Sequence, residues 1–194
     1  MSSTNLTTRA RILKSTQDLL EAGRVTEVRM SDIAKLSGIS RQALYLHFPN
    51  RADLLVATTR YLDEVHAIET VFDQRVVPAK GLDKLTEFVA VWGNYIPKIH
   101  GVGKALMAMM DGDAEARAAW DNRMTAVRRI AASVVESLQD EGRLSPELSK
   151  KEATDLLWTL VSVRNWESLR HDCRWSQKRY ISHMERAAIA LLTA

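Results

Sequence analysis

The chain has 194 residues, 46% of them hydrophobic, with only eight glycines and four prolines, which is the composition of a folded, mostly helical protein of one or two small domains. No apolar run approaches the ~18 residues that a membrane helix needs, so a membrane is not an expected partner. The single cysteine, Cys173, excludes an intramolecular disulfide. The opening residues MSSTNLTTRAR contain no apolar segment typical of a secretion signal. We therefore expect a cytoplasmic protein.

Charge is distributed unevenly along the chain. Residues 1–60 contain nine Lys and Arg against five Asp and Glu, whereas residues 61–194 contain 18 against 19. The basic excess of the first segment favours a polyanionic partner there. Taken alone the excess is modest, because domains that bind nothing acidic often have the same balance.

Hydrophobic periodicity predicts an all-α chain of about nine helices. A first helix is expected over 8–22, and Pro97 is expected to break the chain between two later helices. The remaining helices are expected at 31–37, 40–48, 50–74, 80–96, 104–110, 113–141, 149–170 and from 176 to the C-terminus.

The segment from Ser31 to Leu54 has the layout of a helix-turn-helix. Gly38 can adopt the left-handed backbone that ends a helix, and the Ser40 hydroxyl can cap the next one. Arg41 stands at the start of this second helix, where DNA-reading helices present side chains to base edges. The layout therefore predicts recognition of a DNA sequence.

This segment resembles the DNA-binding domain of the TetR family of bacterial transcriptional regulators, over residues 9–55. The matching residues are Ile33-Ala34, Ser37-Gly38-Ile39-Ser40, Leu44-Tyr45, His47-Phe48 and Asn50-Arg51-Ala52-Asp53-Leu54-Leu55. The triplet Arg41-Gln42-Ala43 departs from the small residues of many relatives, which affects the bases that are read. The resemblance implies a DNA-binding domain over 1–55 and a helical ligand-binding and dimerisation domain over 56–194, where only the helical layout matches.

Side chains of the reading helix are the candidate contacts to double-stranded DNA. Arg41 can hold guanine through two hydrogen bonds, Gln42 can hold adenine in the same way, and Leu46 can touch a thymine methyl group. The family positions imply phosphate contacts from Ser31, Ser40, Tyr45, His47 and Arg51. For each side chain the alternative is an ordinary surface, capping or packing role.

The predicted helix over 149–170 opens with a capping-box pattern, Ser149 and Glu152, and is apolar on more than one side. So broad an apolar surface must be covered twice, by the rest of the chain and by a second copy. In TetR-like proteins the last two helices pair with those of a partner. The resemblance implies a homodimer interface with Leu157, Val161, Tyr180, Met184, Ala188 and Leu191, and burial within a monomer is the alternative.

Large soft and aromatic side chains gather in the second half of the chain. All five tryptophans follow residue 90, and residues 106–110 read Leu-Met-Ala-Met-Met. Methionine adapts to varied shapes, which suits a pocket for an apolar or aromatic effector, as the resemblance also implies. The candidate lining residues, each of which could equally be core, are Tyr61, Val65, Phe72, Trp92, Tyr95, Met107, Met110, Trp120, Met124 and Trp158.

The helix predicted over 50–74 suggests a switch. It would span ~35–40 Å and join the reading head to the ligand domain. An effector against its C-terminal half would tilt it and change the distance between the two reading helices of a dimer. Because major grooves recur every ~34 Å along one face of DNA, a small shift would release a palindromic operator. Repression is the common mode of the family.

Other function classes are less favoured. The chain contains no glycine-rich phosphate loop, no nucleophile elbow and no HExxH, so we expect neither an enzyme nor a cofactor. A redox role for Cys173, which lies between His171 and Arg174, is an alternative to a passive loop cysteine. A metal site at His171 and Cys173 lacks supporting local spacing. A ligand carrier with a relic reading head is disfavoured because Arg41 and Gln42 remain suited to DNA.

Overall fold

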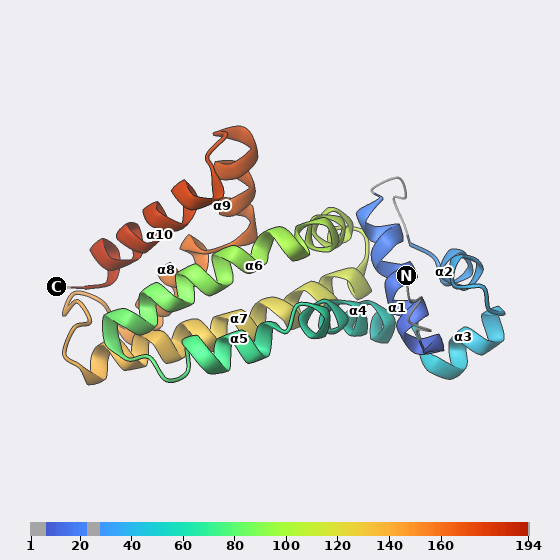
Figure 1. The fold of residues 1–194 in the computed structure, drawn as a ribbon, viewed down its shortest axis with the longest axis horizontal. Coiled ribbons are helices and arrows are strands. Elements are labelled where there is room, and N and C mark those ends of the chain that lie inside the picture. Colours follow the sequence, from blue (N-terminus) through green and yellow to red (C-terminus); the bar gives the residue numbers. More distant parts are fainter. Residues whose placement is uncertain (1–6, 23–27, 194) are drawn as a thin grey trace, which may run out of the picture. The chain divides into compact units, whose positions relative to one another are not determined.

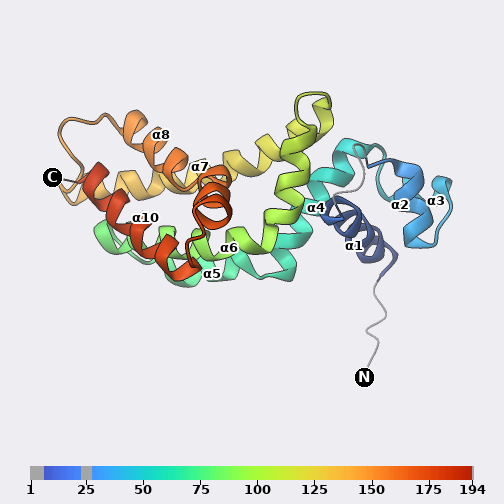
Figure 2. The same ribbon diagram turned by 90° about the horizontal axis from the view of Figure 1, so that it is seen from above.

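The computed structural model describes residues 7–22 and 28–193, and helices dominate both segments (Figure 1, Figure 2). This confirms the predicted all-α fold class. No helix in these two segments is long and apolar enough to cross a membrane. In chain order the helices are α1 (Thr8–Glu21), α2 (Met30–Ser37), α3 (Arg41–His47), α4 (Arg51–Val65), α5 (Ile68–Arg75), α6 (Gly81–Met109), α7 (Ala114–Asp140), α8 (Lys150–Leu160), α9 (Val163–Glu167), the π-helical turn η1 (Ser168–Asp172) and α10 (Gln177–Leu192).

The chain forms two compact units. The first comprises Met1–Val65 with Ile99–Arg123, and the second comprises His66–Lys98 with Met124–Ala194. These units do not coincide with a single boundary at residues 55 and 56, because residues 99–123 pack with the N-terminal helices. Helices α6 and α7 therefore each contribute residues to both units.

The core of the first unit is built around α1. This helix packs against α2 and α4, and α2 packs in turn against α3. Each helix contributes apolar side chains with no exposed surface: Ile12, Ile33, Leu44 and Leu54 are all 0% exposed. Their burial fixes the inner face of each short helix, so the opposite face of α3 is free for recognition.

The helix predicted over 50–74 is wrong as one element. Helix α4 ends at Val65, Ala67 has a left-handed backbone with φ 48°, and α5 begins at Ile68. A left-handed residue cannot continue a right-handed helix and is uncommon for a residue with a Cβ atom. The break accompanies a change of buried face, because Val65 is 55% exposed whereas Ile68 and Phe72 are buried.

The break predicted at Pro97 is also wrong, because α6 runs through it. A helical proline has no N–H for the carbonyl four residues earlier, which here belongs to Gly93. Gln177, at the start of α10, replaces the missing donor: its Nε2 donates to the Gly93 carbonyl at 2.9 Å. A partner far away in sequence thus keeps the helix intact.

The helix predicted over 149–170 is interrupted after α8. Trp92 Nε1 donates to the carbonyl of Val161 at 2.9 Å, which satisfies that group outside the helix. The next residue, Ser162, starts α9 by accepting a hydrogen bond from the backbone N–H of Asn165 at 3.2 Å. Side-chain hydrogen bonds therefore separate two helices that the hydrophobic pattern joins.

Candidate nucleic-acid interface

The turn between α2 and α3 is fixed by local hydrogen bonds. Gly38 has φ 68°, in the left-handed region, and its N–H donates to the Lys35 carbonyl at 3.2 Å. Ser40 Oγ accepts from the Ala43 N–H at 3.1 Å and so caps α3. The helix-turn-helix predicted from these residues is present.

Helix α3 is held from its inner side. Leu44 is 0% exposed and Phe48, directly after the helix, is 2% exposed. Asn50 then opens α4, since its Oδ1 accepts from the Asp53 N–H at 2.8 Å. The short helix is therefore anchored at its centre and at its C-terminal end.

The outer side of α3 carries Arg41, Gln42, Tyr45 and Leu46, which we call the reading surface. Tyr45 is 38% exposed and Leu46 88% exposed, and both Arg41 and Gln42 are exposed. Arg41 Nη2 donates to the Tyr45 hydroxyl at 3.4 Å, so the two side chains lie together. Leu46 is the most exposed large apolar side chain of the described residues, which suits a position that a partner covers.

The other predicted phosphate contacts flank this surface. Ser31, in α2, and Ser40 are exposed, and His47 is half-buried at the end of α3. The His47 carbonyl accepts from Arg9 Nη1 at 3.3 Å, and the Arg9 guanidinium lies 4.3 Å from the centre of the Phe48 ring. Arg9 is not among the residues predicted from the sequence, because only the packing of α1 against α4 brings it to the end of α3.

Arg51 corrects the predicted set of phosphate contacts. Its side chain is 13% exposed, and its Nη1 lies 2.7 Å from Asp113 Oδ2 and 3.2 Å from Glu115 Oε2. Its Nε donates to the Val28 carbonyl at 2.6 Å. Because these partners within the first unit occupy the guanidinium, Arg51 has a structural role and is withdrawn from the phosphate contacts.

Asp113 is held from two directions. Its Oδ1 accepts from the backbone N–H groups of Glu115 and Ala116, both at 3.1 Å, so it caps α7, while Oδ2 faces Arg51. Burial would raise the pKa of this carboxyl, but the hydrogen bonds from Ala116 and from the Arg51 guanidinium outweigh burial and lower the pKa. The Asp113 carboxyl is therefore ionised at neutral pH.

A second ion pair joins the same two helices. Arg123 Nη2 lies 2.7 Å from Asp63 Oδ1, and the two side chains are 16% and 8% exposed. Arg51 and Asp63 lie at opposite ends of α4, and their partners follow the same order along α7. The two helices therefore run in the same direction, and an ion pair joins each end of α4 to the N-terminal part of α7.

Comparison with known proteins gives the segment a family. The family model described as bacterial regulatory proteins of the tetR family matches residues 12–58. This range contains α2, α3 and the turn between them. Residues 12–58 therefore match the TetR family of bacterial regulatory proteins.

Curated and solved relatives agree. The HTH-type transcriptional regulator TtgR of Pseudomonas putida is 37% identical over 59 residues, 30% of this chain and 28% of TtgR. The match thus spans about a quarter of that relative. A TetR-family protein from Rhodococcus sp. has a TM-score of 0.76 at 20% identity and covers 96% of this chain and 99% of its own. A protein from Saccharomonospora viridis, solved with choline, has a TM-score of 0.70 at 18% identity and covers 96% and 97%. At these identities the solved structures show the TetR-like fold.

The residues predicted to line an effector pocket fall in both units of the chain. Trp120 lines a cavity of about 10 Å³ next to Gly103 and Arg123, which is room for about one water molecule. Tyr61 lines a larger groove of the first unit. Val65 is exposed, and Met107, Met110 and Trp158 are half-buried. Phe72, Trp92, Tyr95 and Met124 are core residues of the second unit.

Five of the six residues predicted at a dimer interface are buried within their own chain. Their exposed fractions are between 0% and 7%. These residues lie on the inner faces of α8 and α10, and the two helices pack against each other. Leu191 differs, with 40% of its surface exposed. The buried residues are Leu157, Val161, Tyr180, Met184 and Ala188.

The sequence also left open a redox role for Cys173 and a metal site. Cys173 is exposed and its thiol is free. Across residues 7–22 and 28–193, no group of three or more His, Cys, Asp or Glu side chains is arranged to hold a metal ion.

Proposed function

We propose that this chain is a transcriptional regulator that binds a specific sequence of double-stranded DNA in the cytoplasm of a bacterium. One observation carries the proposal: the reading surface is exposed on a helix whose inner face is locked into a core. Docking α3 in a major groove would bring Arg41, Gln42 and Leu46 to base edges. Specificity needs such fixed positions, because two hydrogen bonds from one side chain to a base require a defined approach.

Phosphate contacts would come from the flanks of that surface. Ser31, Ser40, Tyr45 and His47 keep this proposed role, since none of these side chains lies in a largely buried ion pair as Arg51 does. Contacts to phosphates set the register of α3 without reading sequence. Base and phosphate contacts should therefore respond differently to substitution.

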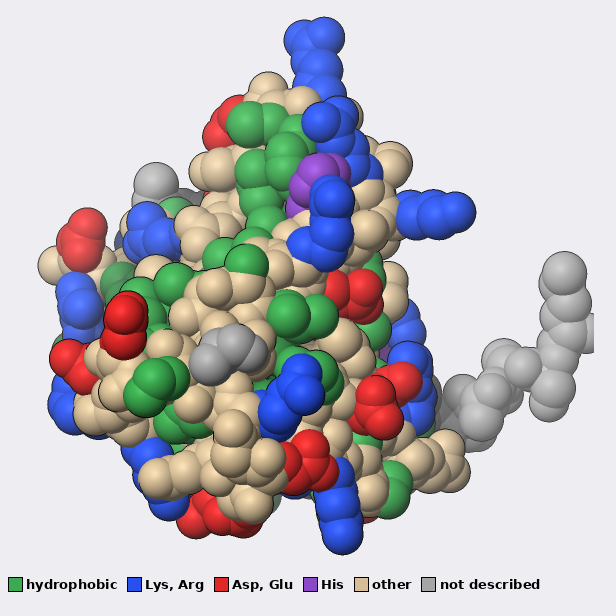
Figure 3. Space-filling model, turned by 90° about the vertical axis from the view of Figure 1, so that its left-hand side faces the viewer, with side chains coloured by type: hydrophobic (Ala, Val, Ile, Leu, Met, Phe, Trp, Pro, Cys, Tyr) green, Lys and Arg blue, Asp and Glu red, His purple; other side chains and the backbone are tan. Residues whose placement is uncertain are grey.

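We propose a homodimer as the DNA-binding form, with a palindromic site. The outer faces of α8 and α10 retain exposed apolar side chains, Leu156 at 37% and Leu191 at 40%. Figure 3 looks onto the end of the molecule where α10 finishes and shows hydrophobic side chains exposed between charged ones. These outer faces replace the buried stripes as the candidate interface. A two-fold axis would present two copies of α3 to the two half-sites.

We further propose repression that a small apolar or aromatic effector relieves. The choline bound to the Saccharomonospora viridis protein supports effector binding on this fold. Because two ion pairs clamp α4 to α7, a shift of the α6 and α7 segments in the first unit would move α4 and hence α3. An effector need prefer the released state by only about 3 kcal/mol to weaken DNA binding roughly a hundredfold. This mechanism does not require the single continuous helix that was predicted over 50–74.

Selection of bound duplexes from a random DNA pool tests the proposal. At ~150 mM salt, non-specific binding to phosphates is suppressed. Enrichment of a palindrome by the purified chain would support a dimeric, sequence-specific regulator and would point to its target genes. The selected duplex then serves for affinity measurements.

Two variants sharpen this experiment. Arg41→Ala combined with Tyr45→Ala removes two side chains of the reading surface that no core contact requires. We expect this variant to lose enrichment of the palindrome. Arg129→Ala, at an exposed arginine of α7, is the matched control and should retain it. Unchanged affinity of the double variant for the selected duplex would contradict the assignment of α3.

A further inference from the structure

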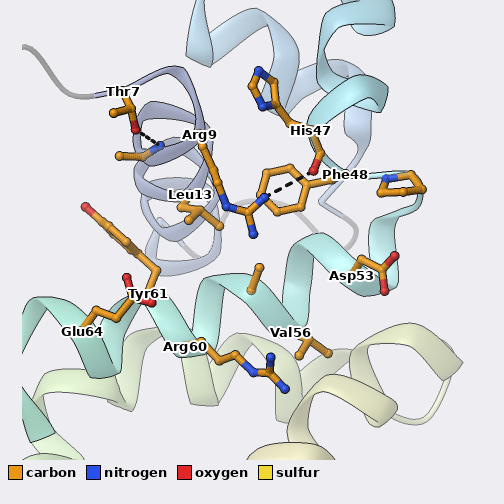
Figure 4. Close-up of a pocket in the computed structure, with 13 residues that line it drawn as sticks. Thr7, Arg9, Leu13, His47, Phe48, Asp53, Val56, Arg60, Tyr61 and Glu64 are labelled. Atoms are coloured by element: carbon orange, nitrogen blue, oxygen red, sulfur yellow. Dashed lines mark hydrogen bonds between the residues drawn. The ribbon is translucent and has the colours of Figure 1, made fainter. Parts of the chain in front are cut away.

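A groove lies between α1 and α4 in the first unit (Figure 4). Its volume is about 670 Å³, within the range of ~300–1,000 Å³ that is usual for small-molecule sites. Of the residues predicted to bind an effector, the groove contains only Tyr61. It therefore shares one residue with the predicted effector pocket and is otherwise lined by different residues.

Apolar side chains form part of the groove wall. Leu13 comes from α1, Phe48 from the end of α3 and Val56 from α4. Leu13 and Phe48 are 6% and 2% exposed, so core packing holds them in place. Val56 is half-buried, so an apolar or aromatic body would bury surface mainly against Val56.

Two guanidinium groups also line the groove. Arg9 reaches from α1 toward α4 across Phe48, as Figure 4 shows, and Arg60 projects from α4. Among residues 7–22 and 28–193, neither makes an ion pair with a carboxylate. Arg9 contacts the Phe48 ring with its face and the His47 carbonyl with one N–H group. Its other N–H donors remain available.

The acidic side chains of the groove lie away from its centre. In Figure 4, Asp53 is at one end and Glu64 is beside Tyr61 at the other. Asp53 Oδ2 already accepts from Asn50 Nδ2 at 3.0 Å. The middle of the groove therefore combines an apolar wall with the Arg9 guanidinium, whereas the Arg60 side chain extends along the other side of α4 at the rim of the groove (Figure 4).

We propose that this groove binds a small amphipathic organic anion, a carboxylate on an aromatic or apolar body. The carboxylate accepts hydrogen bonds from Arg9, whose planar fork matches its two oxygens, and Arg60 adds a second positive charge. The apolar body packs against the half-buried Val56 and Ala57, with the buried Leu13 and Phe48 behind them as a fixed wall. Arg9 also donates to the carbonyl of His47, the last residue of α3, so the Arg9 side chain links the proposed site directly to the end of α3.

Calorimetric titration of the full chain with 2-naphthoate tests this site without DNA, so its result is independent of the proposed function. The neutral analogue 2-naphthalenemethanol has a similar body without the charge. We expect the alcohol to bind at least about tenfold more weakly than the acid, because it loses the charge-assisted hydrogen bonds.

Variants locate the binding. Arg9→Gln and Arg60→Gln should each weaken 2-naphthoate binding, Arg9→Gln by about tenfold or more. Arg11→Gln is the matched control, since Arg11 is exposed on the same helix and does not line the groove. Its affinity for 2-naphthoate should equal that of the unmodified chain. Thermal unfolding followed by circular dichroism verifies that each variant is folded.

Two results would overturn the proposal. The first is equal binding of 2-naphthoate by the unmodified chain and by the Arg9→Gln, Arg60→Gln double variant, which would place the anion elsewhere. The second is no binding of 2-naphthoate, together with weaker binding of the double variant to duplexes of every sequence. That outcome would assign both arginines to the DNA backbone, because phosphate contacts carry no sequence information.

Discussion

Arg51 Nη1 lies 2.7 Å from Asp113 Oδ2, so the first residue of α4 is joined to the cap of α7. The resemblance to the TetR family predicts a phosphate contact for Arg51, yet its side chain is only 13% exposed. The pair instead ties the helix that follows the reading head to the segment 99–123 of the same unit. Movement of that segment is thereby linked to α4.

Asp113→Asn should lower the free energy of unfolding by about 2 kcal/mol, because it leaves a largely buried guanidinium without its closest charge partner. Asparagine is also a good N-cap, so the variant tests the charge more than the cap. Asp111→Asn is the control: Asp111 faces Arg117 at 3.3 Å with a fully exposed side chain and should change stability by less than about 0.5 kcal/mol. Urea denaturation monitored by circular dichroism measures both.

The contribution of Asp113 should depend on pH in one direction. Its pKa is lowered in the folded chain, so the carboxylate stabilises the fold at every pH above the unfolded pKa, about 3.9. This stabilisation is lost as the pH falls through the folded pKa. The stability difference between the unmodified chain and Asp113→Asn should be constant from about pH 5 to 7 and shrink below about pH 4. A difference of full size near pH 3 would contradict the ion pair.

Local signals in the sequence predicted local structure well. Gly38 ends one helix through its own left-handed backbone, and Ser40 starts the next by accepting from the N–H of Ala43, three residues away. The capping box of Ser149 and Glu152 is likewise present, with both of its hydrogen bonds. The exposed side of α3 also followed from sequence, since helical spacing separates inner from outer positions.

Features that depend on distant partners could not be read from the sequence. Gln177 keeps α6 continuous at Pro97 by donating to a carbonyl 84 residues away. The Arg51 guanidinium, a predicted phosphate contact, instead donates to a carboxylate 62 residues away. The left-handed Ala67 interrupts the helix predicted over 50–74, although no glycine or proline marks that position in the sequence. The hydrophobic periodicity around Tyr180 predicted which positions of α10 are buried. Periodicity alone does not show whether the same chain or a second copy covers those positions.

Leu46→Ala should weaken DNA binding without affecting stability. With 88% of its surface exposed, the side chain contributes little to the folded core. If it packs against a thymine methyl group, its removal should cost about 1 kcal/mol of binding free energy to the selected duplex. Leu36→Ala, at an exposed leucine of α2, serves as the control. Fluorescence anisotropy with a labelled duplex measures affinity, and equal losses for both variants would argue against a specific role for Leu46.

Tyr180→Phe should keep or raise the stability, by up to about 1 kcal/mol. The side chain is 1% exposed, and among the described residues its buried hydroxyl has no hydrogen-bond partner. Burial raises the pKa of Tyr180, so the folded chain resists ionisation and loses stability as the pH rises above about 10, the unfolded value. Tyr180→Phe should be less sensitive to alkali. Urea denaturation at pH 7 and pH 10.5 tests both effects, and a marked loss of stability at pH 7 would reveal a partner for the hydroxyl.

Two glycines of α6 should respond oppositely to alanine. In a helix interior, Gly→Ala gains up to about 1 kcal/mol from lower backbone entropy in the unfolded chain. At Gly101 a Cβ atom would meet the Cγ atom of Glu21 at 2.7 Å, and this exposed, flexible side chain can move away. At Gly103 it would lie 2.9 Å from Cζ3 of Trp120, a ring that is only 8% exposed.

Gly101→Ala should therefore stabilise the chain, whereas Gly103→Ala should destabilise it by about 1–3 kcal/mol through overpacking. Combining Gly103→Ala with Trp120→Phe should recover part of the loss from Gly103→Ala, because the smaller ring leaves room for the methyl group. A double-mutant cycle measured by urea denaturation quantifies this coupling. Additive effects would mean that the ring and the glycine are not in contact, and the close approach of α6 to Trp120 would then have to be abandoned.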